Sequence, residues 1–64
     1  MELWIYIGEN VLIELCNGQR FIGKVTNYDD EVDNESGEDS IHLDDGELLY
    51  DFDESEIKEI KVID

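Results

Sequence analysis

The chain contains no proline, one cysteine, one histidine and four basic residues among its 64 positions. A lone thiol, Cys16, cannot form an intramolecular disulfide, and a chain without disulfides suits a reducing compartment. No hydrophobic run approaches the ~20 residues that cross a bilayer. The apolar segment 3–7 follows Glu2 rather than a basic stretch, so it does not resemble a signal peptide. We therefore expect a complete cytoplasmic chain that starts at its own Met1 and has no membrane contact.

Positive charge is missing from the whole middle of the chain. Fourteen of the nineteen acidic residues lie between Val25 and Ile57, all four basic residues lie outside that range, and the formal net charge is −15. A negative field of this size repels nucleic acid, because binding to nucleic acid depends on Lys and Arg displacing condensed counterions. The same field attracts cations and basic protein surfaces. Direct binding of nucleic acid is therefore not expected.

The apolar residues that are present are enough for a folded domain. They make up 41% of the chain and include one Trp, three Tyr and two Phe. This content is too high for a disordered acidic tail. The length allows a single domain, residues 1–64, whose core is close to the smallest that is stable alone.

Alternation of apolar and polar residues predicts two strands in the first half of the chain. The first strand covers residues 11–15 and the second reaches from about residue 21 to Tyr28, with a hairpin turn at Asn17-Gly18. Gly23 marks a position where the second strand bends sharply or where another backbone comes close. The residues expected to face inward are Val11, Ile13, Leu15, Phe21, Gly23 and Val25.

The second half begins with a loop over residues 29–39, which contains seven acids. A third strand follows at residues 40–44, then a type I′ hairpin turn at Asp45-Gly46, then a fourth strand at residues 48–52. The residues expected to face inward are Ile41, Leu43, Leu48, Tyr50 and Phe52, with Glu47, Asp51 and Asp53 pointing away.

Three shorter segments complete the prediction. Residues 53–56 are typical of one helical turn with acids near its N-terminus, and residues 57–63 of a last strand. The unbroken apolar character of residues 3–7 favours a buried or inter-subunit strand over a short helix, so a homo-oligomer stays open. Short strands with tight turns predict an all-β fold, a small and strongly bent five-stranded barrel.

The first half also resembles a known sequence motif. The order and spacing are similar to those of the first Sm motif at Gly8, Val11, Leu15, Asn17-Gly18, Phe21, Gly23, Val25 and Tyr28-Asp29. The resemblance is to small Sm-like (LSM) proteins of the bacterial and phage type, extends roughly from Gly8 to Asn34, and implies an SH3-like barrel. The Arg-Gly pair of the second Sm motif is missing, and residues 53–56 stand in its place.

In Sm-like proteins, which form rings of six or seven subunits, the Asp and Asn after the second strand help to form a uridine pocket. The resemblance thus implies an alternative RNA pocket at Tyr28, Asp29 and Asn34. Asn34 lies one residue too far from Asp29, although the step from Asp30 to Asn34 restores the spacing.

Residues of the kinds used in catalysis are present, but no pattern groups them. His42 points outward on the third strand without a marked Ser or Cys partner, and Cys16 has no basic neighbour closer than Arg20. The acidic loop lacks the glycine and bidentate Glu of an EF-hand. The sequence therefore permits no more than weak, adventitious binding of a divalent ion there. We expect no catalytic residue, no dedicated metal site and no cofactor.

Two explanations of the acidic block remain. It is either a solvated surface or an imitation of the phosphate rows of a nucleic acid, since duplex DNA carries one negative charge per ~1.7 Å. Small acidic inhibitors of phages and mobile elements have a similar size and charge. Our leading hypothesis is a non-enzymatic module that docks on a basic, nucleic-acid-binding surface of a partner protein and accepts bidentate arginine contacts. The residues assigned to that contact are Asp29, Asp30, Glu31, Asp33, Glu35, Asp44, Asp45, Asp51 and Asp53.

Overall fold

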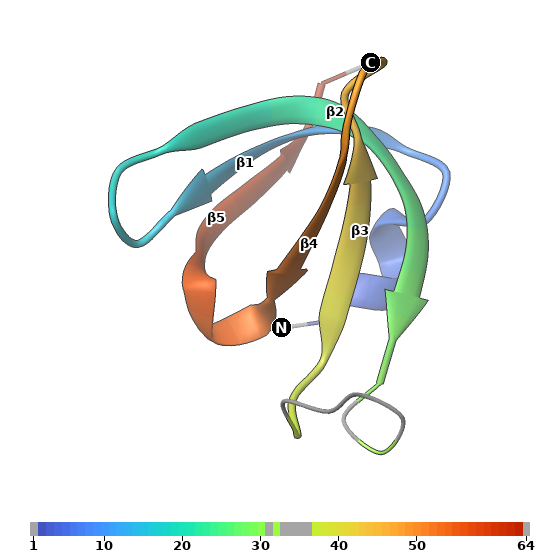
Figure 1. Ribbon diagram of the computed structural model, residues 1–64, viewed down its shortest axis with the longest axis vertical. Coiled ribbons are helices and arrows are strands. Elements are labelled where there is room, and N and C mark those ends of the chain that lie inside the picture. The colour runs from blue at the N-terminus through green and yellow to red at the C-terminus, as the bar shows by residue number, and fades with distance from the viewer. Residues whose placement is uncertain (1, 31, 33–36, 64) are drawn as a thin grey trace.

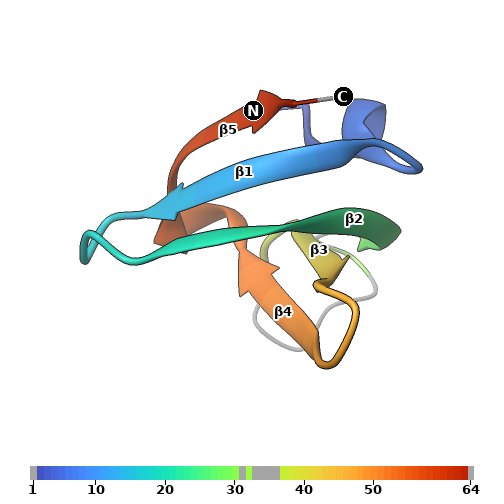
Figure 2. The ribbon, with the colours of Figure 1, turned by 90° about the horizontal axis from the view of Figure 1, so that it is seen from above.

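The computed structural model describes residues 2–30, 32 and 37–63 (Figure 1). Its elements, in chain order, are η1 (Leu3–Tyr6), β1 (Asn10–Leu15), β2 (Arg20–Asp29), β3 (Ser40–Asp44), β4 (Leu49–Asp53), η2 (Glu54–Glu56) and β5 (Ile57–Val62). The five strands form one antiparallel sheet in the order β4-β3-β2-β1-β5. Figure 2 shows this sheet curling back on itself, with β3 and β4 facing β1 and β5. The predicted all-β, barrel-like fold of five strands is confirmed.

The long strand β2 belongs to both halves of the curled sheet. From Arg20 to Lys24 it pairs with β1, and from Lys24 to Asp29 it pairs with β3, with an irregularity in register between Val25 and Asn27. A Cβ atom at Gly23 would collide with the carbonyl group of Asp44, whose carbon would lie 2.9 Å away. Only glycine therefore lets the end of β3 come this close to β2, as the sequence predicted for this position.

The core lies inside the curl. The fully or nearly fully buried side chains are Leu3, Val11, Ile13, Leu15, Val25, Ile41, Leu43, Phe52 and Ile57. Phe21, Tyr50 and Phe52 add an aromatic cluster, in which the Phe21 ring lies 4.9 Å from Tyr50 and 5.0 Å from Phe52 between centroids. These contacts confirm the predicted inward faces of β1 to β4, with Leu48 as the exception, since it is exposed in the turn before β4.

The two hairpin turns differ from one another. The predicted turn at Asn17-Gly18 is confirmed, because the Gly18 N–H donates to the Leu15 carbonyl over 2.9 Å and Gly18 has a φ of 91°. The type I′ prediction for Asp45-Gly46 is wrong. Type I′ needs positive φ at both central residues, and among the described residues only glycines have positive φ. The turn instead places Gly46, at φ 101°, before Glu47, and the Asp45 N–H donates to the Leu48 carbonyl over 3.2 Å.

The N-terminal segment is a 3₁₀-helix, so the strand predicted for residues 3–7 is wrong. Its backbone groups bond locally: the Ile5 N–H donates to the Glu2 carbonyl and the Ile7 N–H to the Trp4 carbonyl. Leu3 is fully buried and Tyr6 packs, partly buried, against the core, whereas the side chains of Trp4, Ile5 and Ile7 are about half exposed. An unbroken run of apolar residues does not indicate which of its side chains face the core and which face solvent.

The C-terminal elements match the prediction. η2 is the expected helical turn. It is hydrogen-bonded to the segment before β3, where the Glu54 N–H donates to the Asp39 carbonyl, and to the turn after β1, where the Glu56 carbonyl accepts from the Cys16 N–H. β5 then pairs with β1. Within the described ranges 2–30, 32 and 37–63, the helices are too short to cross a membrane.

The close approach of β2 and β3 predicts a stability effect at one position. Replacement Gly23→Ala should lower the free energy of unfolding by about 1–3 kcal/mol, because the new methyl group forces the backbones apart. Urea denaturation followed by tryptophan fluorescence measures this change. The control is Ile22→Thr at the neighbouring exposed position, which keeps a β-branched residue and should change stability by about 0.5 kcal/mol or less. Equal stability of Gly23→Ala and the unmodified protein would contradict this packing.

Candidate functional site

The outer surface of β2, β3 and β4 carries an acidic face, defined by Asp29, His42, Asp44, Asp51 and Asp53. Alternation explains its composition, since Ile41, Leu43 and Phe52 face the core while His42, Asp44, Asp51 and Asp53 point to the other side; Ser40 is the buried exception. The register places Ser40 between Asp29 and Asp53, and His42 directly opposite Asp51. β3 and β4 contain no Lys or Arg. Four of the nine acids assigned from the sequence therefore share one face.

His42 occupies the middle of the acidic face. Its Nε2 atom lies 2.9 Å from Asp29 Oδ2 on β2 and 3.9 Å from Asp51 Oδ2 on β4. The side chain is partly exposed, at 31% of its full accessible area. The outward direction of His42 was predicted, but its carboxylate partners were missed. Alternation along β3 predicts that His42 faces outward. Its carboxylate partners depend on how β2 and β4 are registered against β3, which alternation does not give.

Two further acids of the predicted set hold the β3–β4 turn. The Asp45 carboxylate accepts hydrogen bonds from the N–H groups of Glu47 and Leu48, both at 2.8 Å, and from the Tyr50 hydroxyl. The backbone donors lower the pKa of Asp45 below its ordinary value. Asp44 Oδ1 accepts from the Gly46 N–H at 2.8 Å. Asp45 is thus bound into the turn, whereas the rest of the Asp44 carboxylate is exposed.

A second group of acids surrounds Tyr28 near the end of β2. Burial raises the pKa of Tyr28 to about 12, helped by a hydrogen bond to the Asp39 carboxylate and by the negative charges of Asp39, Asp30 and Glu54. Trp4 packs edge-on against the Tyr28 ring, with the centroids 6.0 Å apart. The phenol is therefore held in its neutral form as a hydrogen-bond donor.

Two members of the predicted RNA pocket, Tyr28 and Asp29, lie on opposite sides of β2. Tyr28 is opposite Ile41 in the ladder and belongs to the inner side of β2, while the next residue, Asp29, belongs to the outer side and bonds His42. Asn34 lies outside the described residues. The same holds for three members of the predicted partner contact, Glu31, Asp33 and Glu35.

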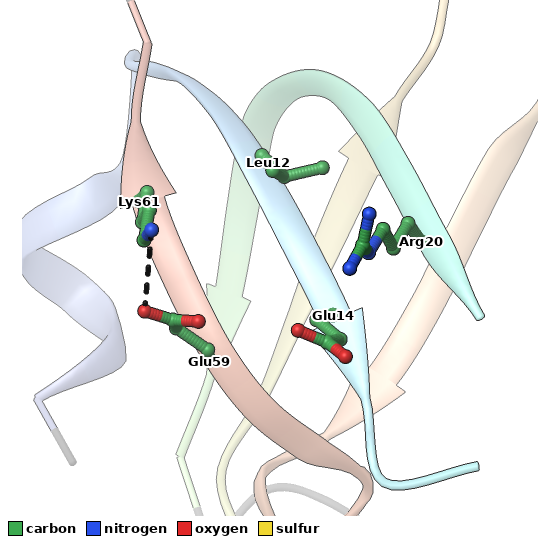
Figure 3. Close-up of a pocket in the computed structure, with 5 residues that line it drawn as sticks. All are labelled: Leu12, Glu14, Arg20, Glu59 and Lys61. Atoms are coloured by element: carbon green, nitrogen blue, oxygen red, sulfur yellow. Dashed lines mark ion pairs between the residues drawn. The ribbon is translucent and has the colours of Figure 1, made fainter. Parts of the chain in front are cut away.

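The opposite half of the sheet carries a mixed face, defined by Leu12, Glu14, Arg20, Glu59 and Lys61 on the outer side of β1, β2 and β5 (Figure 3). These residues line a shallow hollow of about 210 Å³. Lys61 Nζ lies 3.6 Å from Glu59 Oε1, an ion pair within one strand. Basic and acidic side chains alternate here. The acidic face differs, because β3 and β4 contain no Lys or Arg and Lys24 of β2 is the basic residue opposite Asp44.

Groups with catalytic potential lie apart. Cys16 is exposed in the turn after β1, where its Sγ atom lies 3.6 Å from the Ser55 carbonyl oxygen, while His42 belongs to the acidic face. In residues 2–30, 32 and 37–63, no three His, Cys, Asp or Glu side chains are arranged to hold a metal ion.

Comparison of the chain with protein-family models, with curated proteins and with solved structures gave no match. The assignment of a function therefore depends on the surface itself.

The surroundings of Tyr28 predict a late step in an alkaline titration. Tyr28 should ionise at a pH of about 12, and Asp39→Asn should lower that pH, because it removes a charge and a hydrogen-bond acceptor. Folding favours the neutral phenol, so its contribution to stability is complete below the ordinary pKa of ~10 and is lost as the pH rises from there to about 12. Tyrosinate absorbance measures the step. Burial also raises the pKa of Tyr50, so Tyr28→Phe should reduce the late absorbance rather than abolish it. An unchanged late step in that variant would refute the assignment.

Proposed function

We propose that this protein is a non-enzymatic, cytoplasmic binding module whose acidic face docks on the basic, nucleic-acid-binding surface of a partner protein. The observation that carries the proposal is the separation of charge by the fold. Acids of β2, β3 and β4 share one outer surface, where Lys24 lies opposite Asp44, and the basic residues Arg20 and Lys61 lie on the mixed face. A mainly negative surface steers a basic partner toward one side of the molecule.

The spacing of the acids suits a contact with several cations at once. Residues two apart on a strand, such as Asp51 and Asp53, are separated by about 7 Å, and neighbouring strands by about 5 Å. Both distances are below the Debye length of ~8 Å at physiological ionic strength, so the carboxylates act as one field. The Asp51 side chain is 63% exposed and that of Asp29 is 38% exposed, which leaves oxygens accessible to arginine.

Size supports the comparison with nucleic acid. The longest dimension of the molecule is 30 Å. A duplex of that length carries about 18 phosphate charges. The chain has nineteen acidic residues and a net charge of −15 in the same length. A basic groove that accepts a short duplex therefore meets a similar amount of charge here, in the manner of the small acidic inhibitors made by phages and mobile elements.

The alternative is an Sm-like RNA-binding ring subunit. Its support is the likeness of Gly8 to Asn34 to the first Sm motif, together with the close approach of backbones at Gly23. The acidic face and the opposite orientations of Tyr28 and Asp29 favour the docking proposal instead. Kinship with Sm-like proteins is compatible with either function, because folds of this kind carry unrelated binding sites.

A pair of matched variants tests the docking face. Asp44→Lys with Asp51→Lys changes the acidic face, and Glu14→Lys with Glu59→Lys makes the same change in net charge on the mixed face. Binding to a synthetic arginine-rich peptide is measured by fluorescence anisotropy over a series of salt concentrations. The acidic-face variant should bind roughly tenfold more weakly or worse, about 1.4 kcal/mol, and show a shallower salt dependence. The mixed-face variant should lose less than about threefold.

Two results would contradict the proposal. Equal losses in the two variants would mean that overall charge, rather than one face, governs binding. Retention of a uridine-rich RNA oligomer on a filter at physiological ionic strength would favour the Sm-like alternative.

In a lysate of the native host, the proposed partner should be a nucleic-acid-binding protein that duplex DNA releases from the immobilised module.

A further inference from the structure

We propose that His42 is a pH-sensitive regulator of the acidic face, which weakens docking of the basic partner when its imidazole is protonated. This inference rests on the proposed function, since it concerns the strength of the same contact. His42 is the one histidine of the sequence, and its ring lies between two carboxylates that are assigned to partner binding. A histidine side chain is the group that ordinarily changes its charge between pH 5 and 8.

The geometry places the imidazole where it competes with a partner. With a neutral ring, the Nε2–H donates to Asp29 Oδ2 at 2.9 Å, while Asp51 Oδ2 at 3.9 Å lies beyond hydrogen-bond distance. Both carboxylates then keep their full charge toward solvent. Protonation adds a positive charge between them and converts both contacts into ion pairs. An arginine of the partner must then displace an internal cation from the two carboxylates.

The charged groups on the strands around His42 include three acids and one lysine. β2 contributes Asp29, β4 contributes Asp51, and β3 itself contributes Asp44 two residues further along. The lysine is Lys24 of β2, which lies opposite Asp44 in the ladder, whereas Asp29 and Asp51 lie opposite Ser40 and His42. The helix η1 also packs against β3, but its residues 3–6 include no Asp, Glu, Lys or Arg. Protonation of His42 therefore adds a positive charge beside Asp29 and Asp51, neither of which has a lysine or arginine as ladder partner.

Protonation of His42 does not place a charge in the buried core. The His42 side chain is 31% exposed, so a proton reaches the ring from solvent and the ring changes charge without entering the core. Its neighbours Ile41 and Leu43, which are fully buried, keep the strand in place in either state. The expected response is thus a change in binding strength with the fold retained.

The experiment measures affinity for an arginine-rich peptide between pH 5.5 and 7.5 at constant salt. Arginine stays charged and ordinary carboxylates stay ionised across this range, so neither contributes a large change. Affinity of the unmodified protein should rise roughly two- to fivefold toward pH 7.5. His42→Gln, which keeps a neutral hydrogen-bond donor, should show a flat profile, and His42→Arg a flat profile at the weaker level. Circular dichroism at both ends of the range checks that each variant is folded.

The outcomes separate the regulator from the docking function. A flat profile for the unmodified protein, or an unchanged pH dependence in His42→Gln, would refute the role of His42 while leaving the docking proposal standing. Absence of salt-sensitive peptide binding at every pH would refute the docking proposal, and the regulator with it. A rising profile that only the two variants lose supports both.

Discussion

The structure depends on the close approach of β2 and β3 at Gly23, where the backbone of β3 comes too close for any side chain. β2 pairs with β1 along its first half and with β3 along its second, so this contact joins the two halves of the sheet. The sheet then closes around Ile13, Val25 and Leu43, which are fully buried. In a domain of 64 residues this closure is what makes the small core sufficient.

The curl of the sheet distributes the charge. It turns β3 and β4 away from β1 and β5, so the outer surfaces of the two halves face different directions (Figure 2). The acids of one half are thereby collected into the acidic face, with Lys24 opposite Asp44, and Arg20 and Lys61 stay with Glu14 and Glu59 on the mixed face. A chain with a net charge of −15 resists compaction by self-repulsion. Hydrogen bonds from backbone N–H groups to Asp45 and from the imidazole to Asp29 stabilise two of these carboxylates.

Much of the fold could be predicted because its signals are local. Alternation identified the inward residues of β1 to β4 other than Leu48, and Asn17-Gly18 located the first hairpin. The predictions were wrong where the local sequence is compatible with two different backbone conformations. The apolar run 3–7 favoured a strand over a short helix, but in the 3₁₀-helix Leu3 and Tyr6 pack in or against the core while Trp4 and Ile5 stay exposed. At Asp45-Gly46 the Asp45 carboxylate satisfied the turn N–H groups, which moved the turn by one residue and exposed Leu48.

The sequence alone determined the sign of the net charge, the five strands of the sheet from residue 10 onward and the close backbone approach at Gly23, since these follow from composition, period-two alternation and one glycine. Only the tertiary structure decided which charges meet. The contact of His42 with Asp29 and Asp51 joins three strands, and each strand pairing adds a register that neighbouring residues do not encode. The opposite orientations of Tyr28 and Asp29 relative to the core likewise followed from the pairing of β2 with β3, because a shift of one residue would exchange the two faces.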